Sequence, residues 1–291
     1  MPYFQPQLSL PSALTFKNKT ILVTGASAGL GLAATKSLLY YGASEIIAAV
    51  RSPSKAEAAK AIILSDPIVK KSNPSAQITI LQVDFADYQS VKTLAVEVKK
   101  RYDDKLDMVL LNAGTGSLKF EKVATGHEKT VQVNLLSPAL LAVELLPVLE
   151  KTALSKGVPS RLTWVGSFVQ FDHTLDKTPI KEDEKVLKFF DKEENFNSMG
   201  RYSDSKLLGT MFVEHLATFV DREKVLLNEV SPGMVKTGFG EYPFWLRGIM
   251  AIFFGLKARS PEQGAKTYLH ALGVAGSETH GVYLSDNQVT K

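Results

Sequence analysis

The expected fold class follows from residues 20–31, which read Thr20-Ile-Leu-Val-Thr-Gly-Ala-Ser-Ala-Gly-Leu-Gly31. An apolar run ends in three closely spaced glycines, as a buried parallel strand does where it turns into a helix. The glycines permit a tight turn and a close approach of the backbone to a ligand. The following helix would direct its free N–H groups at a pyrophosphate. A plain strand-to-helix turn is the simpler interpretation, and the spacing differs from G-x-G-x-x-G, but the position after a first strand favours a phosphate site.

The rest of the chain alternates between apolar strands and helical stretches. We expect strands over residues 20–24, 45–50, 77–83, 106–111, 161–165, 225–230 and 282–284. We expect helices over residues 31–41, 54–64, 88–102, 128–149, 201–220 and 261–272. This alternation predicts an α/β fold in one domain, residues 1–291, with a doubly wound parallel sheet of about seven strands and helices on both faces.

Three segments interrupt the alternation. Residues 1–19 form an N-terminal extension that lacks the basic and apolar regions of a secretory signal. Residues 168–200 and 237–260 are long for loops of a compact α/β unit. Both follow the carboxyl end of an expected strand, where open α/β sheets bind ligands. We therefore expect both insertions on the substrate side.

The second insertion is rich in aromatic and apolar residues, among them Phe239 and Trp245. It predicts a lid over an apolar or aromatic substrate. Packing on the core, a subunit contact and shallow docking on a membrane surface remain alternatives. Candidates for the opposite wall come from the first insertion: Phe168, Phe171, His173 and Met199.

Composition bounds the function. The 291 residues are 45% hydrophobic and 22% charged, with a mean hydropathy of zero, as in a soluble globular protein with a sizeable core, and we expect a cytoplasmic location. There is no cysteine, which excludes disulfides and thiolate catalysis. The five histidines never form an H-x-x-x-H pattern, so no metal site is expected. A net charge of +4 without a long basic run predicts no nucleic-acid partner, and no apolar run suggests a transmembrane segment.

A tyrosine and a lysine stand four residues apart in the expected helix 201–220, within Arg201-Tyr-Ser-Asp-Ser-Lys206. That spacing puts Tyr202 and Lys206 one turn apart on one helix face. An ammonium beside a phenol lowers the pKa of the phenol and suits it to general acid/base chemistry on a carbonyl or alcohol. Most such pairs are ordinary surface neighbours, so the pair gains meaning only from the other motifs.

The cofactor side has its own candidates. The second expected strand ends at Arg51 with no acid to bind a ribose diol, so Arg51 could pair with a 2′-phosphate and Ser27 could add a hydroxyl; a plain surface arginine is the alternative. Asp84 could contact an adenine or merely cap the next turn. Asn112 could hold adjacent strands together, and Gly114 would let the backbone pass close to a cofactor.

Further candidates come from the second half of the chain. Asn134 in an apolar helix needs hydrogen-bond partners and could hold a water beside Lys206, with a purely structural role as the competitor. Ser167 at a strand end could donate to a substrate oxygen. The turn at Pro232-Gly233 leads to Thr237, which could meet a nicotinamide carboxamide.

Together these motifs resemble the short-chain dehydrogenase/reductase family over nearly the whole chain: Thr24 to Gly31, Asn112-Ala-Gly114, Asn134, Ser167, Tyr202-x-x-x-Lys206 and Pro232-Gly233. Within the family, the chain most resembles the retinol-dehydrogenase-like branch and fungal secondary-metabolite reductases. Relatives often have a longer C-terminal tail, so a shortened chain remains open, and the lack of an N-terminal anchor argues against membrane retinoid metabolism.

The resemblance implies a Rossmann fold and a nicotinamide cofactor, NADP(H) because of Arg51. It implies Tyr202 as general acid/base, Lys206 as the group that lowers the phenol pKa and binds the ribose, Ser167 as the group that polarises the carbonyl, and Asn134 as the holder of a relay water. The candidate cofactor-binding residues are Gly25, Ser27, Gly29, Leu30, Gly31, Arg51, Asp84, Asn112, Ala113, Gly114, Tyr202, Lys206, Pro232, Gly233, Val235 and Thr237.

Three functions follow from this set. The first is an NADPH-dependent reductase of a hydrophobic ketone or aldehyde, or the reverse alcohol dehydrogenase. The second is a non-redox cyclase or isomerase that uses the same fold. The third is a cofactor-binding protein that acts through partners, which has no need of the Tyr–Lys pair. Family members often form dimers or tetramers through the helix that carries this pair, so a homodimer is also expected.

Overall fold

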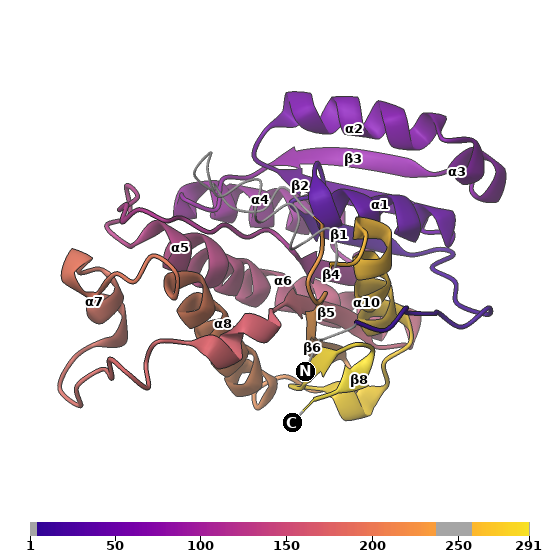
Figure 1. The fold of residues 1–291 in the computed structure, drawn as a ribbon. Helices are drawn as coiled ribbons and strands as arrows, with labels where there is room; N and C mark the ends of the chain where they lie inside the picture. The colour runs from indigo at the N-terminus through magenta and orange to yellow at the C-terminus, as the bar shows by residue number, and fades with distance from the viewer. Residues whose placement is uncertain (1–4, 237–257, 291) are drawn as a thin grey trace.

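The computed structural model describes residues 5–236 and 258–290, and its centre is one continuous sheet (Figure 1). The strand order is β3-β2-β1-β4-β5-β6-β7-β8, parallel throughout except for the antiparallel pair β7–β8. The strands are β1 Thr20–Thr24, β2 Glu45–Val50, β3 Gln77–Gln82, β4 Met108–Leu111, β5 Ser160–Val165, β6 Val225–Ser231, β7 Tyr283–Ser285 and β8 Gln288–Val289. The predicted α/β fold is confirmed, with β8 as a strand that the sequence pattern did not indicate.

Helices cover both faces of the sheet. They are α1 Gly29–Tyr40, α2 Pro53–Ser65, α3 Pro67–Ser72, α4 Tyr88–Arg101, α5 Lys129–Val131, α6 Ser137–Lys156, α7 Val186–Phe190, α8 Arg201–Ala217 and α10 Pro261–Gly273. Helices α1 and α10 pack on one face over Ile21 and Val23, whereas α4, α6 and α8 pack on the other over Leu22. Since neighbouring side chains of a strand point to opposite faces, the wholly apolar strand β1 serves both layers.

The expected helix 128–149 has three parts. A π-helical turn, η1 Gln132–Leu136, lies between α5 and α6. By length and composition, the stretch Lys129–Lys156 could cross a membrane, contrary to our expectation that no apolar run is long enough to do so. However, 56% of its most apolar window is buried inside the protein, where α6 packs against the sheet and α4. It is therefore a core helix.

The segment between β5 and α8 lies alongside α5 and α8 and carries three short helices, η2 Phe168–Asp172, α7 and η3 Glu193–Asn195 (Figure 1). Phe189 and Phe190 of α7 form a separate apolar cluster with Val131. The fully buried Arg201 donates hydrogen bonds to the carbonyl oxygens of Phe190, at 3.0 Å, and Asn195, at 2.8 Å. This arginine therefore fastens the insertion to the first turn of α8, directly before Tyr202.

Candidate active site

The turn between β1 and α1 is a cradle that only glycines permit. Gly25 has φ +70° and Gly29 φ +52°, in the left-handed region. A Cβ on Gly31 would lie 2.6 Å from Asn112 Nδ2 and closer still to the carbonyl oxygen of Gly25. The first turn of α1 follows Ala28, whose side chain makes no capping hydrogen bond. The free backbone N–H groups and the positive dipole end of α1 are therefore suited to bind the pyrophosphate of a dinucleotide.

Thr24 ties this turn to the end of β4. Its buried hydroxyl oxygen accepts hydrogen bonds from the backbone N–H groups of Asn112, at 2.9 Å, and Ala113, at 2.8 Å. The side-chain amide of Asn112 donates back to the Thr24 carbonyl oxygen at 2.9 Å. Asn112 thus holds the adjacent strands β1 and β4 together, as its position in the sequence suggested.

Asn134 lies in the π-helical turn and fixes the loop after β4. Its Oδ1 accepts from the Thr115 N–H at 2.8 Å, and its Nδ2 donates to the Thr115 carbonyl oxygen and to Ser205 Oγ, both at 2.9 Å. A Cβ on Gly114 would lie 3.3 Å from Asn134 Oδ1 and 4.0 Å from Lys206 Nζ. Asn134 therefore performs a structural task beside Lys206; its predicted role with a water stays a prediction.

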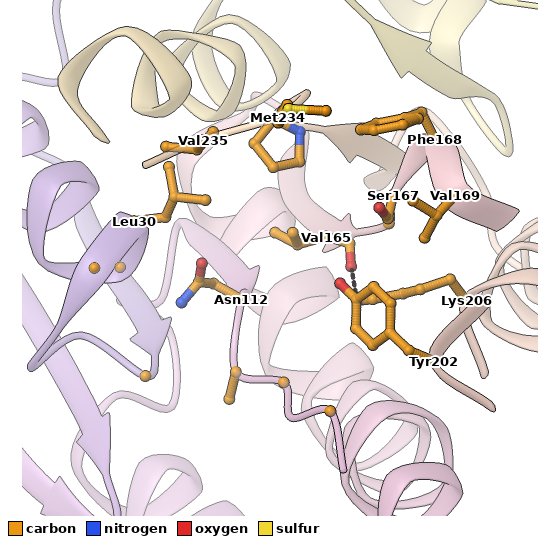
Figure 2. A pocket seen from close by; sticks show the side chains of 18 of the residues that line it. Leu30, Asn112, Val165, Ser167, Phe168, Val169, Tyr202, Lys206, Met234 and Val235 are labelled. Carbon is orange, nitrogen blue, oxygen red and sulfur yellow. Dashed lines mark hydrogen bonds between the residues drawn. The ribbon is translucent and has the colours of Figure 1, made fainter. Parts of the chain in front are cut away.

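Tyr202 and Lys206 lie on α8 at the wall of the cavity, and Figure 2 shows both beside Ser167. Lys206 is 4% exposed, and its Nζ donates to the Val165 carbonyl oxygen at 2.7 Å. The same Nζ lies 5.6 Å from the centroid of the Tyr202 ring. Burial lowers the pKa of Lys206 to about 8. The group therefore remains largely cationic at neutral pH beside the Tyr202 ring.

These elements enclose a cavity of about 710 Å³ between the glycine turn and α8 (Figure 2). Most of the predicted site residues line it: Gly25, Gly29, Leu30, Gly31, Asn112, Ala113, Gly114, Ser167, Phe168, Met199, Tyr202, Lys206, Pro232, Gly233 and Val235. Its size and its mixture of apolar walls and a few polar groups are those of a small-molecule site.

Other predicted residues lie elsewhere. Among the described residues, the predicted site residues that are not part of the cavity wall are Ser27, Arg51, Asp84, Asn134 and Phe171. Arg51 is exposed just after β2, Asp84 Oδ1 accepts from the Ala86 N–H at 2.9 Å as a turn cap, and Phe171 is 64% exposed. His173 is also outside the wall. Thr237, Phe239 and Trp245 lie outside the described residues.

The structure adds cavity residues that sequence reasoning missed, among them Val169, Met234 and Tyr268. Tyr268 on α10 is fully buried, and burial raises its pKa well above the ordinary value, so its phenol stays neutral. An aromatic residue on an amphipathic helix is normally predicted to lie in the core, and no local sequence signal distinguishes Tyr268 from such a core residue. Among the described residues, no cluster of histidines and carboxylates that could hold a metal occurs, and the expectation of no metal site remains a prediction.

The N-terminal segment is joined to the turn after β6. The Gln5 side chain pairs with the backbone of Met234, donating to its carbonyl oxygen at 2.9 Å and accepting from its N–H at 2.8 Å. Lys266 Nζ donates to the Leu8 carbonyl oxygen at 2.7 Å, and Arg259 donates to the carbonyl oxygen of Pro6 at 3.1 Å. Residues 5–8 therefore brace the part of the cavity wall that contains Met234.

Comparisons with known proteins identify relatives of this chain. Residues 19–158 match the family described as short chain dehydrogenase. The chain is 41% identical over 291 residues to the short chain dehydrogenase yanD of Aspergillus niger, covering 99% of this chain and 88% of that protein. It is 39% identical over 292 residues to the short-chain dehydrogenase/reductase tropG of Talaromyces stipitatus, covering 99% of this chain and 88% of that one.

A solved structure, the NADPH-bound carbonyl reductase from chicken fatty liver, aligns with a TM-score of 0.68 at 18% identity, covering 94% of this chain and 99% of that chain. This likeness confirms the fold. The identities to the fungal proteins over nearly the whole chain show the family. The chain belongs to the short-chain dehydrogenase/reductase family, NAD(P)-dependent oxidoreductases that act on CH–OH groups.

Proposed function

We propose that the protein is an NADPH-dependent reductase of a hydrophobic ketone or aldehyde in fungal secondary metabolism, or the reverse alcohol dehydrogenase. The observation that carries the proposal is that Ser167, Tyr202 and Lys206 line one cavity with the glycine turn of β1 and α1. The wall beside them is formed in part by the apolar side chains of Phe168 and Met199. An apolar wall next to a few polar groups favours a hydrophobic carbonyl compound.

Each residue has a defined task in this proposal. A bound nicotinamide supplies or accepts the hydride, as nicotinamide cofactors do. The Ser167 hydroxyl donates a hydrogen bond to the substrate oxygen, and the Tyr202 phenol delivers the proton to that oxygen. The Lys206 ammonium stabilises the phenolate that remains, because it is held near the ring by its bond to the Val165 carbonyl oxygen.

The decisive experiment replaces Tyr202 by Phe, which removes the proton donor and keeps the ring. We expect NADPH oxidation with a panel of hydrophobic ketones and aldehydes to fall by about 2–4 orders of magnitude, the usual effect of losing a general acid. Tyr40→Phe is the matched control, because Tyr40 is 45% exposed at the end of α1 and should retain full activity. Full activity of Tyr202→Phe would refute the mechanism, and product formation without net NADPH change would favour the cyclase or isomerase.

The preference for NADPH rests on Arg51, an exposed cation directly after β2 with no acid beside it in the sequence. A guanidinium binds a phosphate through two parallel hydrogen bonds, so a 2′-phosphate is the matching partner. We expect Arg51→Asp to weaken NADPH binding and to strengthen NADH binding in fluorescence titrations. Tighter binding of NADH than of NADPH to the unaltered protein would show that Arg51 does not select the cofactor.

A further inference from the structure

A buried carboxyl group lies directly behind the proposed active site. Glu229 is in β6, between β5 and β7, and is 1% exposed. Its carboxyl occupies the space beside Gly166, the residue between Val165 and Ser167: a Cβ on Gly166 would lie 2.7 Å from Glu229 Cδ and would overlap Oε1. The glycine before Ser167 is therefore required by the carboxyl, not only by the turn.

Thr210 connects this carboxyl to both sides of the site. Its Oγ1 lies 3.0 Å from Glu229 Oε1 and 3.2 Å from the Lys206 carbonyl oxygen, and it also forms a hydrogen bond with Gln170 Oε1 of η2. Three acceptor oxygens thus surround a hydroxyl that has one proton. A protonated Glu229 supplies the second proton by donating to Thr210. Turning the Gln170 amide would also supply one, but would leave a charged carboxylate buried with a single hydrogen bond.

Burial of Glu229 favours the same protonation state near neutral pH. The titratable groups around it are Lys206 and Glu214 of α8 and the phenol of Tyr283 on β7, the residue paired with Glu229. Burial raises the pKa of Glu229 to about 8, and the Lys206 ammonium opposes that rise. Glu229 Oε2 has no hydrogen-bond partner among the residues that the structure describes, which also favours the neutral acid.

We propose that Glu229 is a positioning residue with two states, an inference that rests on the proposed function of Tyr202 and Lys206. The neutral acid joins β6, α8 and η2 through Thr210 and so fixes Ser167 relative to the Tyr–Lys pair. When the pH rises, Glu229 releases its proton to solvent, and the carboxylate keeps the Lys206 ammonium charged. Glu229 and Lys206 together therefore extend activity toward alkaline pH.

The test is the pH profile of kcat for Glu229→Gln, an isosteric mimic of the neutral acid. Below neutral pH we expect rates near those of the unaltered enzyme. We expect the alkaline limb to move to lower pH by about one unit, because a nearby opposite charge changes a pKa by at least about that much. Glu214→Gln is the matched control, because Glu214 is exposed on α8 and its loss should leave the limb in place. A Glu229→Gln limb that coincides with that of the unaltered enzyme, or moves to higher pH, overturns the proposal.

Two further measurements separate this proposal from the proposed function. Thr210→Val keeps the Glu229 carboxyl but removes the hydroxyl that connects it to α8 and η2. It should therefore lower kcat at all pH values without moving the alkaline limb to lower pH. A movement to lower pH equal to that of Glu229→Gln would show that the position of the limb depends on packing and not on the charge of Glu229.

The second measurement is urea unfolding, which needs no substrate. A carboxyl whose pKa is raised on folding makes stability fall as pH rises toward 8, so Glu229→Gln should gain stability relative to the unaltered protein between pH 5 and pH 8. Equal pH dependence, or failure of Glu229→Gln to fold at neutral pH, contradicts a neutral Glu229.

Discussion

Replacing Thr24 by Val tests the tie between the glycine turn and β4. Val keeps the shape of Thr but removes the oxygen that accepts from the backbone N–H groups of Asn112 and Ala113. An unsatisfied donor costs about 1–3 kcal/mol when buried, and these two N–H groups are only partly buried, so we take about 1–2 kcal/mol for each. The free energy of unfolding should therefore fall by about 2–4 kcal/mol.

The assay is urea unfolding followed by circular dichroism, together with NADPH titration of the folded protein. Thr35→Val is the matched control, because Thr35 is equally buried but donates its proton to the Gly31 carbonyl oxygen of its own helix at 2.8 Å. That bond only supplements the helix, so its loss should cost well under about 1 kcal/mol. NADPH affinity should fall only in Thr24→Val. Equal losses of stability in the two variants would refute the assignment of Thr24 as the acceptor that fixes the cofactor turn.

Three other changes have expected outcomes. Lys206→Met should abolish turnover, yet urea unfolding at pH 7 should show a free energy of unfolding that is higher by about 1–3 kcal/mol, because burial lowers the pKa of this ammonium and its charge therefore penalises folding below pH 8. The gain should shrink as the pH rises above 8, and a loss of stability at pH 7 would contradict this explanation. Arg201→Met should speed limited proteolysis within residues 168–200, and an unchanged cleavage pattern would show that other contacts hold the insertion. Gln5→Ala should weaken NADPH binding in a fluorescence titration, whereas the exposed neighbour Gln7→Ala should not; equal affinities would show that residues 5–8 do not brace the cavity.

The sequence was sufficient for the layers of the fold. The expected strand ranges 20–24 and 45–50 are those of β1 and β2, because wholly buried strands have an unbroken apolar run. It failed where a local signal was ambiguous. The expected helices omit α3, which begins where Asp66 caps the N–H groups of Ile68 and Val69. The expected strands also omit β8, which follows a turn at Asp286 and Asn287; both residues have positive φ, as in a tight hairpin.

The site was predictable only in part. Some cavity residues, such as Gly25 and Gly31, belong to one turn and stand close together in the chain, so their spacing in the sequence reveals them. Glu229 is different, because its neighbours Gly166 and Thr210 come from other elements and no spacing connects them. In the sequence, Glu229 is a single charged residue within an expected strand, and the hydrophobic pattern would place such a residue at a sheet edge or on an exposed face.

The bracing of the cavity by residues 5–8 has a consequence for synthesis. Gln5 leaves the ribosome early, but its partner Met234 is made 229 residues later. Contacts of such long separation form late, because the intervening chain must first be closed into place. The first half of the sheet can therefore assemble during translation while the N-terminal segment waits unattached.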